Sequence, residues 1–164
     1  MDVAGLKQLS LAVEHLLEQD SFGSTVMRLR SELARSTEAF VWSTLELSSL
    51  PFELPEEIKS AWVFHLRRDV PSGCHYHPNS VQHMVVVSGQ GQASIGGQCR
   101  DTAPFGSSSS VTDEWLIIDR GVPHEFIPAG DDITVVSFHT CAADELEEIG
   151  CDTGSARHYE AADA

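Results

Sequence analysis

The chain has 164 residues, of which 41% are hydrophobic, and this length and composition predict a single domain with a hydrophobic core. Twenty-five acidic residues against ten basic ones give a formal charge of -15, which disfavours nucleic acid and anionic membrane surfaces as partners. The N-terminus lacks the basic region and unbroken apolar run of a secretory signal, and no apolar run is long enough to span a membrane. We therefore expect a soluble, cytoplasmic protein.

Residues 1–40 predict two amphipathic helices. In the first, apolar side chains recur at three- and four-residue steps, at Leu6, Leu9, Val13, Leu16 and Leu17. This helix is expected to end near Asp20. The second is expected to start after the stretch from Ser21 to Ser24, because the apolar residues from Val26 to Leu33 keep helical spacing. We expect both helices to pack against the rest of the domain or a second subunit rather than to form a substrate lid.

Residues 41–140 predict a β-sandwich or barrel. Short runs rich in β-branched and aromatic residues, separated by turn-forming residues, occur at 41–47, 60–69, 83–89, 91–97, 114–121, 124–130 and 131–140. Residues 51–57 are expected to link the first strand to the main sheet. The Ser- and Gly-rich segment 96–113 is interpreted as a mobile loop, and whether it closes over a site stays open.

Residues 141–164 form an acidic C-terminal segment, for which we expect one short helix followed by a frayed tail. The chain also contains four cysteines, Cys74, Cys99, Cys141 and Cys151, which are widely spaced and include no C-x-x-C pair. This spacing argues against a zinc knuckle or a redox dithiol. In a cytoplasmic protein, we expect all of them to be reduced thiols.

The stretch from His75 to Gln82 carries the strongest chemical signal. Side chains two residues apart on a strand point to the same face, so His75 and His77 can approach one metal ion together. Gln82 follows after a turn, and its amide oxygen could add a weak ligand from a neighbouring strand. His124 follows a Gly/Pro turn and starts another run. This set predicts one divalent ion, either Fe, Zn, Mn or Ni, with coordination positions left open.

Two motifs then show a resemblance to a known superfamily. His75, His77, Gln82 and Gly89 match the spacing of the first cupin motif, with Gln in place of Glu. Gly121 and His124 match the second motif, although Asp119 occupies its proline position and Asp69 the place of an expected glycine. The sequence thus resembles the cupin superfamily over residues 41–140. The resemblance implies a mainly β protein with a cupin-type β-barrel, a double-stranded β-helix or jelly roll, here preceded by two α-helices, and it implies a homodimer.

Glutamine at position 82 changes the expected charge of the site. Three neutral imidazoles and an amide leave a bound divalent ion with a charge near +2, which favours a small anionic, oxygen-rich substrate. The set resembles that of small cupins acting on unsaturated uronates, whereas three-histidine cupins without the acid include thiol and diketone dioxygenases. We expect a dioxygenase-type oxidoreductase first. A metal-dependent isomerase or lyase acting on a sugar acid or keto acid, and a non-catalytic small-molecule-binding protein, remain as alternatives.

Other polar residues are weaker candidates for the site. His83 competes with Gln82, but a one-residue shift on a strand turns its side chain to the opposite face. Arg67 and His65 share one face of residues 60–69; if this face points inward, Arg67 could bind a substrate carboxylate, and otherwise it is solvated. Asp119 and Glu125 could orient His124. Cys74 should point away from the metal, and the remaining histidines, His15, His139 and His158, are interpreted as structural.

Overall fold

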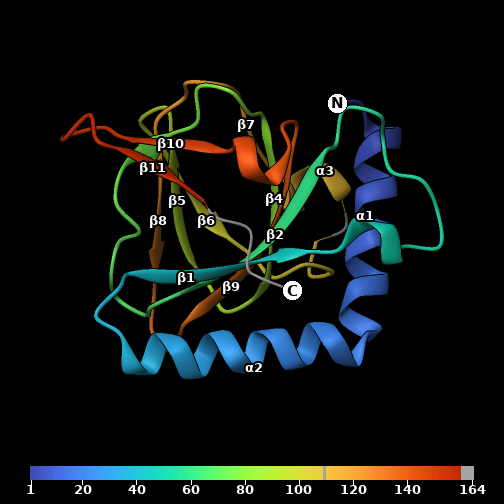
Figure 1. Ribbon diagram of the computed structural model, residues 1–164, viewed down its shortest axis with the longest axis horizontal. Helices are drawn as coiled ribbons and strands as arrows, with labels where there is room; N and C mark the ends of the chain where they lie inside the picture. The colour runs from blue at the N-terminus through green and yellow to red at the C-terminus, as the bar shows by residue number, and fades with distance from the viewer. Residues whose placement is uncertain (109, 160–164) are drawn as a thin grey trace.

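The computed structural model describes residues 1–108 and 110–159. Two antiparallel β-sheets face each other, and two helices cover the outer side of one of them (Figure 1). The structure therefore has the mainly β architecture with N-terminal helices that the sequence predicts. Among the described residues, no helix has the length and apolar character needed to cross a membrane.

The two helices are α1 (Val3–Glu18) and α2 (Asp20–Arg35), and only Gln19 separates them. The carboxylate of Asp2 accepts a hydrogen bond from the backbone N–H of Gly5 and so caps the start of α1. The helix α2 begins earlier than expected, and the serine-containing stretch lies inside it. Phe22 in this stretch is buried against the same hydrophobic cluster as Leu29, and such burial outweighs the low helix propensity of serine.

The strands form two sheets with antiparallel neighbours. The five-stranded sheet contains, in spatial order, β1 (Phe40–Leu45), β2 (Ser60–Leu66), β9 (Ile133–His139), β4 (Gln82–Ser88) and β7 (Leu116–Ile118). The six-stranded sheet contains β11 (Ala156–His158), β10 (Glu147–Gly150), β3 (His75–Tyr76), β8 (His124–Pro128), β5 (Gly91–Ile95) and β6 (Gln98–Thr102).

Alternation along β2 divides the core into two parts. Ala61 and Val63 pack with the helices, whereas Trp62, Phe64 and Leu66 belong to the cluster between the sheets. Trp62, Phe64 and Leu66 therefore face the space between the sheets, whereas the alternate residues, which include His65, lie on the helix side. The space between the sheets, lined by this second cluster, is where the candidate site lies.

The expectation of a structureless loop at 96–113 is wrong. Residues 98–102 form β6, which pairs with β5, and Val111–Glu114 form the short helix α3. Gly96 and Gly97 both have positive φ angles, 57° and 81°, so they can make the tight turn that a β-hairpin requires. Residue 109 of this segment lies outside the described residues. Residues 51–57 do connect the 3-10 turn Leu47–Ser49 to β2, as expected of a linker.

The C-terminal segment also differs from the expected helix and tail. After a 3-10 turn at Ala143–Glu145, it forms β10 and β11, which pair with each other as a hairpin. The strand β10 adds to β3, since Ile149 opposes Tyr76 and Gly150 opposes His75. The free backbone groups of β3 thus determine the conformation of this acidic segment, which its composition does not reveal. The expected frayed tail beyond residue 159 lies outside the described residues.

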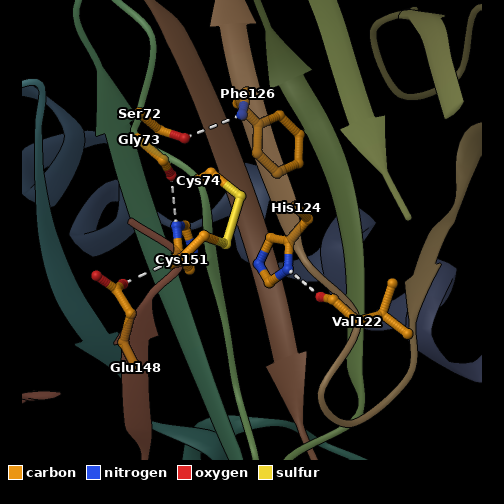
Figure 2. Close-up of a disulfide and its surroundings, with 9 residues drawn as sticks. Ser72, Gly73, Cys74, Val122, His124, Phe126, Glu148 and Cys151 are labelled. Atoms are coloured by element: carbon orange, nitrogen blue, oxygen red, sulfur yellow. Dashed lines mark hydrogen bonds and ion pairs between the residues drawn. A yellow bond between two sulfur atoms is a disulfide. The ribbon is translucent and has the colours of Figure 1, made fainter. Parts of the chain in front are cut away.

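The expectation that all cysteines are reduced is wrong as well. Cys74 and Cys151 form a disulfide, with Cα atoms 5.5 Å apart, beside the paired residues of β3 and β10 (Figure 2). Their sequence separation of 77 residues hides this contact, because only the pairing of β10 with β3 brings them together. Cys99 is free and exposed, and Cys141 is free and buried.

Candidate metal centre

Three histidines converge between the sheets. His75 lies on β3 directly opposite His124 at the start of β8, and His77 follows β3 by one residue. Each residue offers a ring nitrogen, and these nitrogens all lie within 4.8 Å of one another. The side chains are buried. Because the three rings come from two paired strands of one sheet, the backbone register fixes their approach.

Backbone carbonyls orient the three rings in the same way. Nδ1 of His75 lies 2.8 Å from the carbonyl oxygen of Gly73. Nδ1 of His124 lies 3.0 Å from the carbonyl oxygen of Val122, a contact that Figure 2 marks with a dashed line. Nδ1 of His77 lies 2.6 Å from the carbonyl oxygen of Glu147. A carbonyl oxygen can only accept, so Nδ1 carries the hydrogen in each ring. The lone pair of each neutral ring is therefore on Nε2, as a metal-binding imidazole requires.

Gln82 reaches the same space from the opposite sheet, at the start of β4. Its amide nitrogen lies 3.4 Å from Nε2 of His139. The His139 ring also contacts the Ser137 hydroxyl group through Nε2 and the Ser80 hydroxyl group through Nδ1. Its amide oxygen, like Nε2 of His124, is buried without a hydrogen-bond partner among the described residues. Buried acceptors without partners are costly, and a cation between these atoms would satisfy both.

Burial keeps the imidazoles of His77, His124 and His139 neutral. Desolvation, reinforced by the neighbouring His75, lowers the pKa of His77 to about 4 and the pKa of His124 to about 3. Complete burial also lowers the pKa of His139 well below its ordinary value. At neutral pH the lone pairs on His77 and His124 are therefore available, and no proton must leave before a cation binds.

The cavity beside the cluster is small and mostly apolar. About 30 Å³ inside it is open to the centres of water-sized groups, and the space free of protein atoms within it and at its mouth is about 380 Å³. The polar residues His75, His77, Gln82, His124, Ser72 and Tyr159 line it together with the apolar side chains of Phe40, Phe64, Leu66, Met84, Phe126 and Val135. A group bound in this cavity therefore meets nitrogen and oxygen atoms on one side and hydrocarbon on the others.

The C-terminal hairpin brings two further polar residues that the sequence does not indicate. Glu148 on β10 is buried, and its Oε2 lies 3.6 Å from Nε2 of His75. Tyr159, directly after β11, lines the cavity and donates a hydrogen bond from its hydroxyl group to Glu148. Burial, together with the Glu148 carboxylate, raises the pKa of Tyr159 well above its ordinary value. No motif spacing relates these residues to the histidines, so only the sheet pairing could have revealed them.

The structure places Arg67 and His65 away from this cavity. The Arg67 guanidinium donates to the carbonyl oxygens of Leu33 and Ser36 at the end of α2, at 2.6 and 2.9 Å. His65 is buried on the helix side of β2, where Nδ1 lies 3.0 Å from the hydroxyl oxygen of Thr134. Leu66, which lies between them in the sequence, faces the cavity instead, so neither Arg67 nor His65 is placed to contact a ligand of the three histidines.

The same geometry decides which of the other candidate residues belong to the site. His83 is buried next to Gln82 but does not line the cavity, as expected for a one-residue shift on a strand. His124 is oriented by the Val122 carbonyl, so neither Asp119 nor Glu125 is needed for that role. Cys74 is exposed and bonded to Cys151, which leaves it unavailable as a ligand.

No protein-family model matches the chain, and no curated protein matches it in sequence. Solved structures do resemble it. The DMSP lyase DddQ from Ruegeria pomeroyi DSS-3 has a TM-score of 0.53 and 13% identity, covering 71% of this chain and 54% of that one. A salicylate 1,2-dioxygenase from Pseudaminobacter salicylatoxidans has a TM-score of 0.51 and 9% identity, covering 71% of this chain and 31% of that one. KdgF from a Halomonas species has a TM-score of 0.50 and 15% identity, covering 68% of this chain and 89% of that one. Because the sequence identities are this low, the likeness shows that these structures and the chain share a fold, and nothing more.

Proposed function

Because the chain has the cupin fold, we propose that it is a metal-dependent enzyme acting on a small anionic, oxygen-rich substrate, and a dioxygenase-type oxidoreductase when the ion is Fe(II). One observation carries the proposal: three buried imidazoles bring their ligand atoms within 4.8 Å of one another, and in the cavity beside them Nε2 of His124 and Oε1 of Gln82 are buried without a partner among the described residues. A core without a cation would leave these acceptors unsatisfied.

The donor atoms fit a divalent transition ion. Imidazole nitrogen suits iron, zinc and nickel, and an amide oxygen is a harder, weaker ligand that manganese also accepts. Four protein ligands, His75, His77, His124 and Gln82, would leave room for substrate atoms around a five- or six-coordinate ion. Such an ion, when bound, acts as a Lewis acid that polarises an oxygen atom of the substrate.

The residues of the chain itself restrict what can bind. Phe64, Phe126 and the other apolar side chains line most of the cavity and offer no hydrogen bonds to hydroxyl groups of a ligand. A substrate with a chelating anionic head and a small hydrocarbon body, such as a diketone or an α-keto acid, suits this lining better than a polyhydroxylated sugar acid. The apolar lining thus supports the oxygenase candidate among those that the sequence leaves open.

A lyase or isomerase is the second candidate. The ligand set with Gln82 carries no acid, and the resembling DddQ structure is described as a DMSP lyase, so the same cavity with Zn, Mn or Ni could support this chemistry. A non-catalytic binding protein would use the cavity in the same way without turnover.

Oxygen uptake by Fe(II)-loaded protein distinguishes these candidates. We expect uptake with at least one member of a panel of diketones, thiols and α-keto acids, with label from ¹⁸O₂ entering the product. A His124→Ala variant should lose this uptake, and a His158→Ala variant, which removes an exposed histidine on β11, should retain it. Conversion of a keto acid or unsaturated sugar acid by the Zn- or Mn-loaded protein, without oxygen uptake, would contradict the oxygenase and favour the second candidate.

A further inference from the structure

A carboxylate lies beside the metal-binding atoms although position 82 has none. Glu148, which is labelled in Figure 2, is 7% exposed. Its Oε2 lies 3.6 Å from Nε2 of His75, the atom that would bind an ion. An imidazole–zinc bond is about 2.0–2.1 Å long, so this carboxylate oxygen would lie no more than about 6 Å from an ion bound to His75. At such separations opposite charges interact strongly in a poorly solvated site.

The hairpin holds this carboxylate in place but compensates its charge weakly. The Tyr159 hydroxyl group donates a hydrogen bond to Glu148 and carries no charge of its own. Nη1 of Arg157 lies 3.5 Å from Oε1 of Glu148, and the Arg157 side chain is 44% exposed, so solvent weakens this ion pair. A buried carboxylate is expensive unless it is paired, and the remaining side on which a cation could approach is that of His75.

We propose that Glu148, rather than the residue at position 82, supplies the negative charge of the metal site. This inference rests on the proposed metal-dependent function. The C-terminal hairpin thereby replaces the acid missing from the first motif, and the Cys74–Cys151 disulfide and the pairing of β10 with β3 fix its position. Glu148 acts from beside the ligands, because it is not among the residues whose ligand atoms gather within 4.8 Å.

This charge narrows the substrate class. With Gln82 and three neutral imidazoles alone, the site would keep a charge near +2, whereas Glu148 lowers it to near +1. A site of this charge accommodates a monoanionic chelator without excess negative charge. A dianion would place a second negative charge close to Glu148, and we therefore expect monoanions to bind more tightly than dianions of similar size.

The test is a titration of metal-free protein with Co(II), followed by the visible absorption of the bound ion. We expect wild-type protein to bind about one ion per chain, and Glu148→Gln to lower the affinity by about tenfold or more, the range typical of residues that support metal ligands. Azide is then titrated into the Co(II)-loaded proteins. Removing the carboxylate should strengthen azide binding by at least about threefold, since it removes a repelling charge.

The controls separate charge from structure. Asp152→Asn removes one negative charge from an exposed position in the turn of the same hairpin and should leave both affinities unchanged. An equal Co(II) affinity for wild type and Glu148→Gln would overturn the proposal. Parallel weakening of Co(II) and azide binding would also overturn it, because that result indicates a merely structural role. Absence of Co(II) binding by wild-type protein would instead overturn the proposed function itself.

A variant with a shorter side chain covers the case in which Glu148→Gln does not fold. Glu148→Asp keeps the charge but withdraws it by one methylene group from His75 and from Tyr159. We expect its Co(II) affinity to lie between those of wild type and a charge-free site, lower than wild type by at least about threefold. Wild-type affinity in a folded Glu148→Asp protein would contradict a role for the carboxylate at its observed position.

Discussion

Each site histidine donates Nδ1–H to a backbone carbonyl, so the tautomer of all three rings is determined by main-chain atoms. While the rings are neutral, these hydrogen bonds satisfy Nδ1–H of each ring, so burial of the rings costs little free energy. A second proton on one of these rings would place a positive charge in a buried cluster, in contact with the other two imidazole rings. The histidines therefore couple folding to pH in the metal-free protein.

Stability of the metal-free protein should fall in mild acid. The pKa of His77 is about 4 in the folded chain against 6.5 for the free side chain, so between these pH values the unfolded chain binds the proton that the folded chain excludes. The contribution of this ring to the free energy of unfolding is complete above pH 6.5 and is lost as the pH falls toward 4. The loss is on the order of 3 kcal/mol. Thermal unfolding across this range measures it.

The His77→Gln variant is the control for this pH dependence, because its side chain does not titrate. Its melting temperature should decline less steeply between pH 6.5 and 4 than that of the parent protein. Equal slopes for the two proteins would show that the buried ring does not contribute to the acid sensitivity.

Arg67 should contribute to stability and not to the site. Its guanidinium bonds carbonyl groups at the end of α2, where a cation also complements the helix dipole, so Arg67→Gln should lower the free energy of unfolding by about 2 kcal/mol. Chemical denaturation measures this loss. The matched variant Arg68→Gln, at an exposed position, should change stability by no more than about 0.5 kcal/mol. Loss of metal from Arg67→Gln at unchanged stability would contradict this assignment.

At the scale of elements, the C-terminal hairpin is the part of the structure on which the site most depends. The Cys74–Cys151 disulfide closes a loop of 77 residues and joins this hairpin to β3. The double variant Cys74→Ser, Cys151→Ser should unfold with about 2–4 kcal/mol less free energy than the parent protein. Dithiothreitol should lower the melting temperature of the parent protein but leave that of the double variant unchanged.

Thiol titration of the unfolded protein checks the disulfide directly. Without reductant we expect two reactive thiols, from Cys99 and Cys141, and with reductant we expect all four. Four thiols in protein purified without reductant would agree with the cytoplasmic expectation and contradict the disulfide.

Local patterns in the sequence revealed a large part of this fold. Helical spacing predicts α1 and most of α2, and alternation along β2 predicts which of its side chains face inward. Two-residue spacing predicts that His75 and His77 approach each other, because strand geometry alone decides it. The hairpin, the disulfide and Glu148 could not be predicted in this way, since they depend on β10 pairing with a strand about 70 residues earlier in the chain.

For the whole molecule, we propose the homodimer that the resemblance implies. The six-stranded sheet ends at β6 and β11, whose residues are mostly exposed, and a second chain pairing along such an edge would satisfy its free backbone groups. Light scattering during size-exclusion chromatography should then give the mass of two chains. The mass of a single chain across the accessible concentration range would contradict the dimer.

The central claim is that the three histidines and Gln82 hold one divalent ion, and elemental analysis tests it most directly. The protein is purified without added metal and without a nickel resin, beside a variant carrying His75→Ala and His77→Ala. We predict about one ion of iron, zinc, manganese or nickel per chain, which is lost in the variant while its circular dichroism spectrum is retained. Protein without a stoichiometric metal, or a variant that keeps its metal, would contradict the claim.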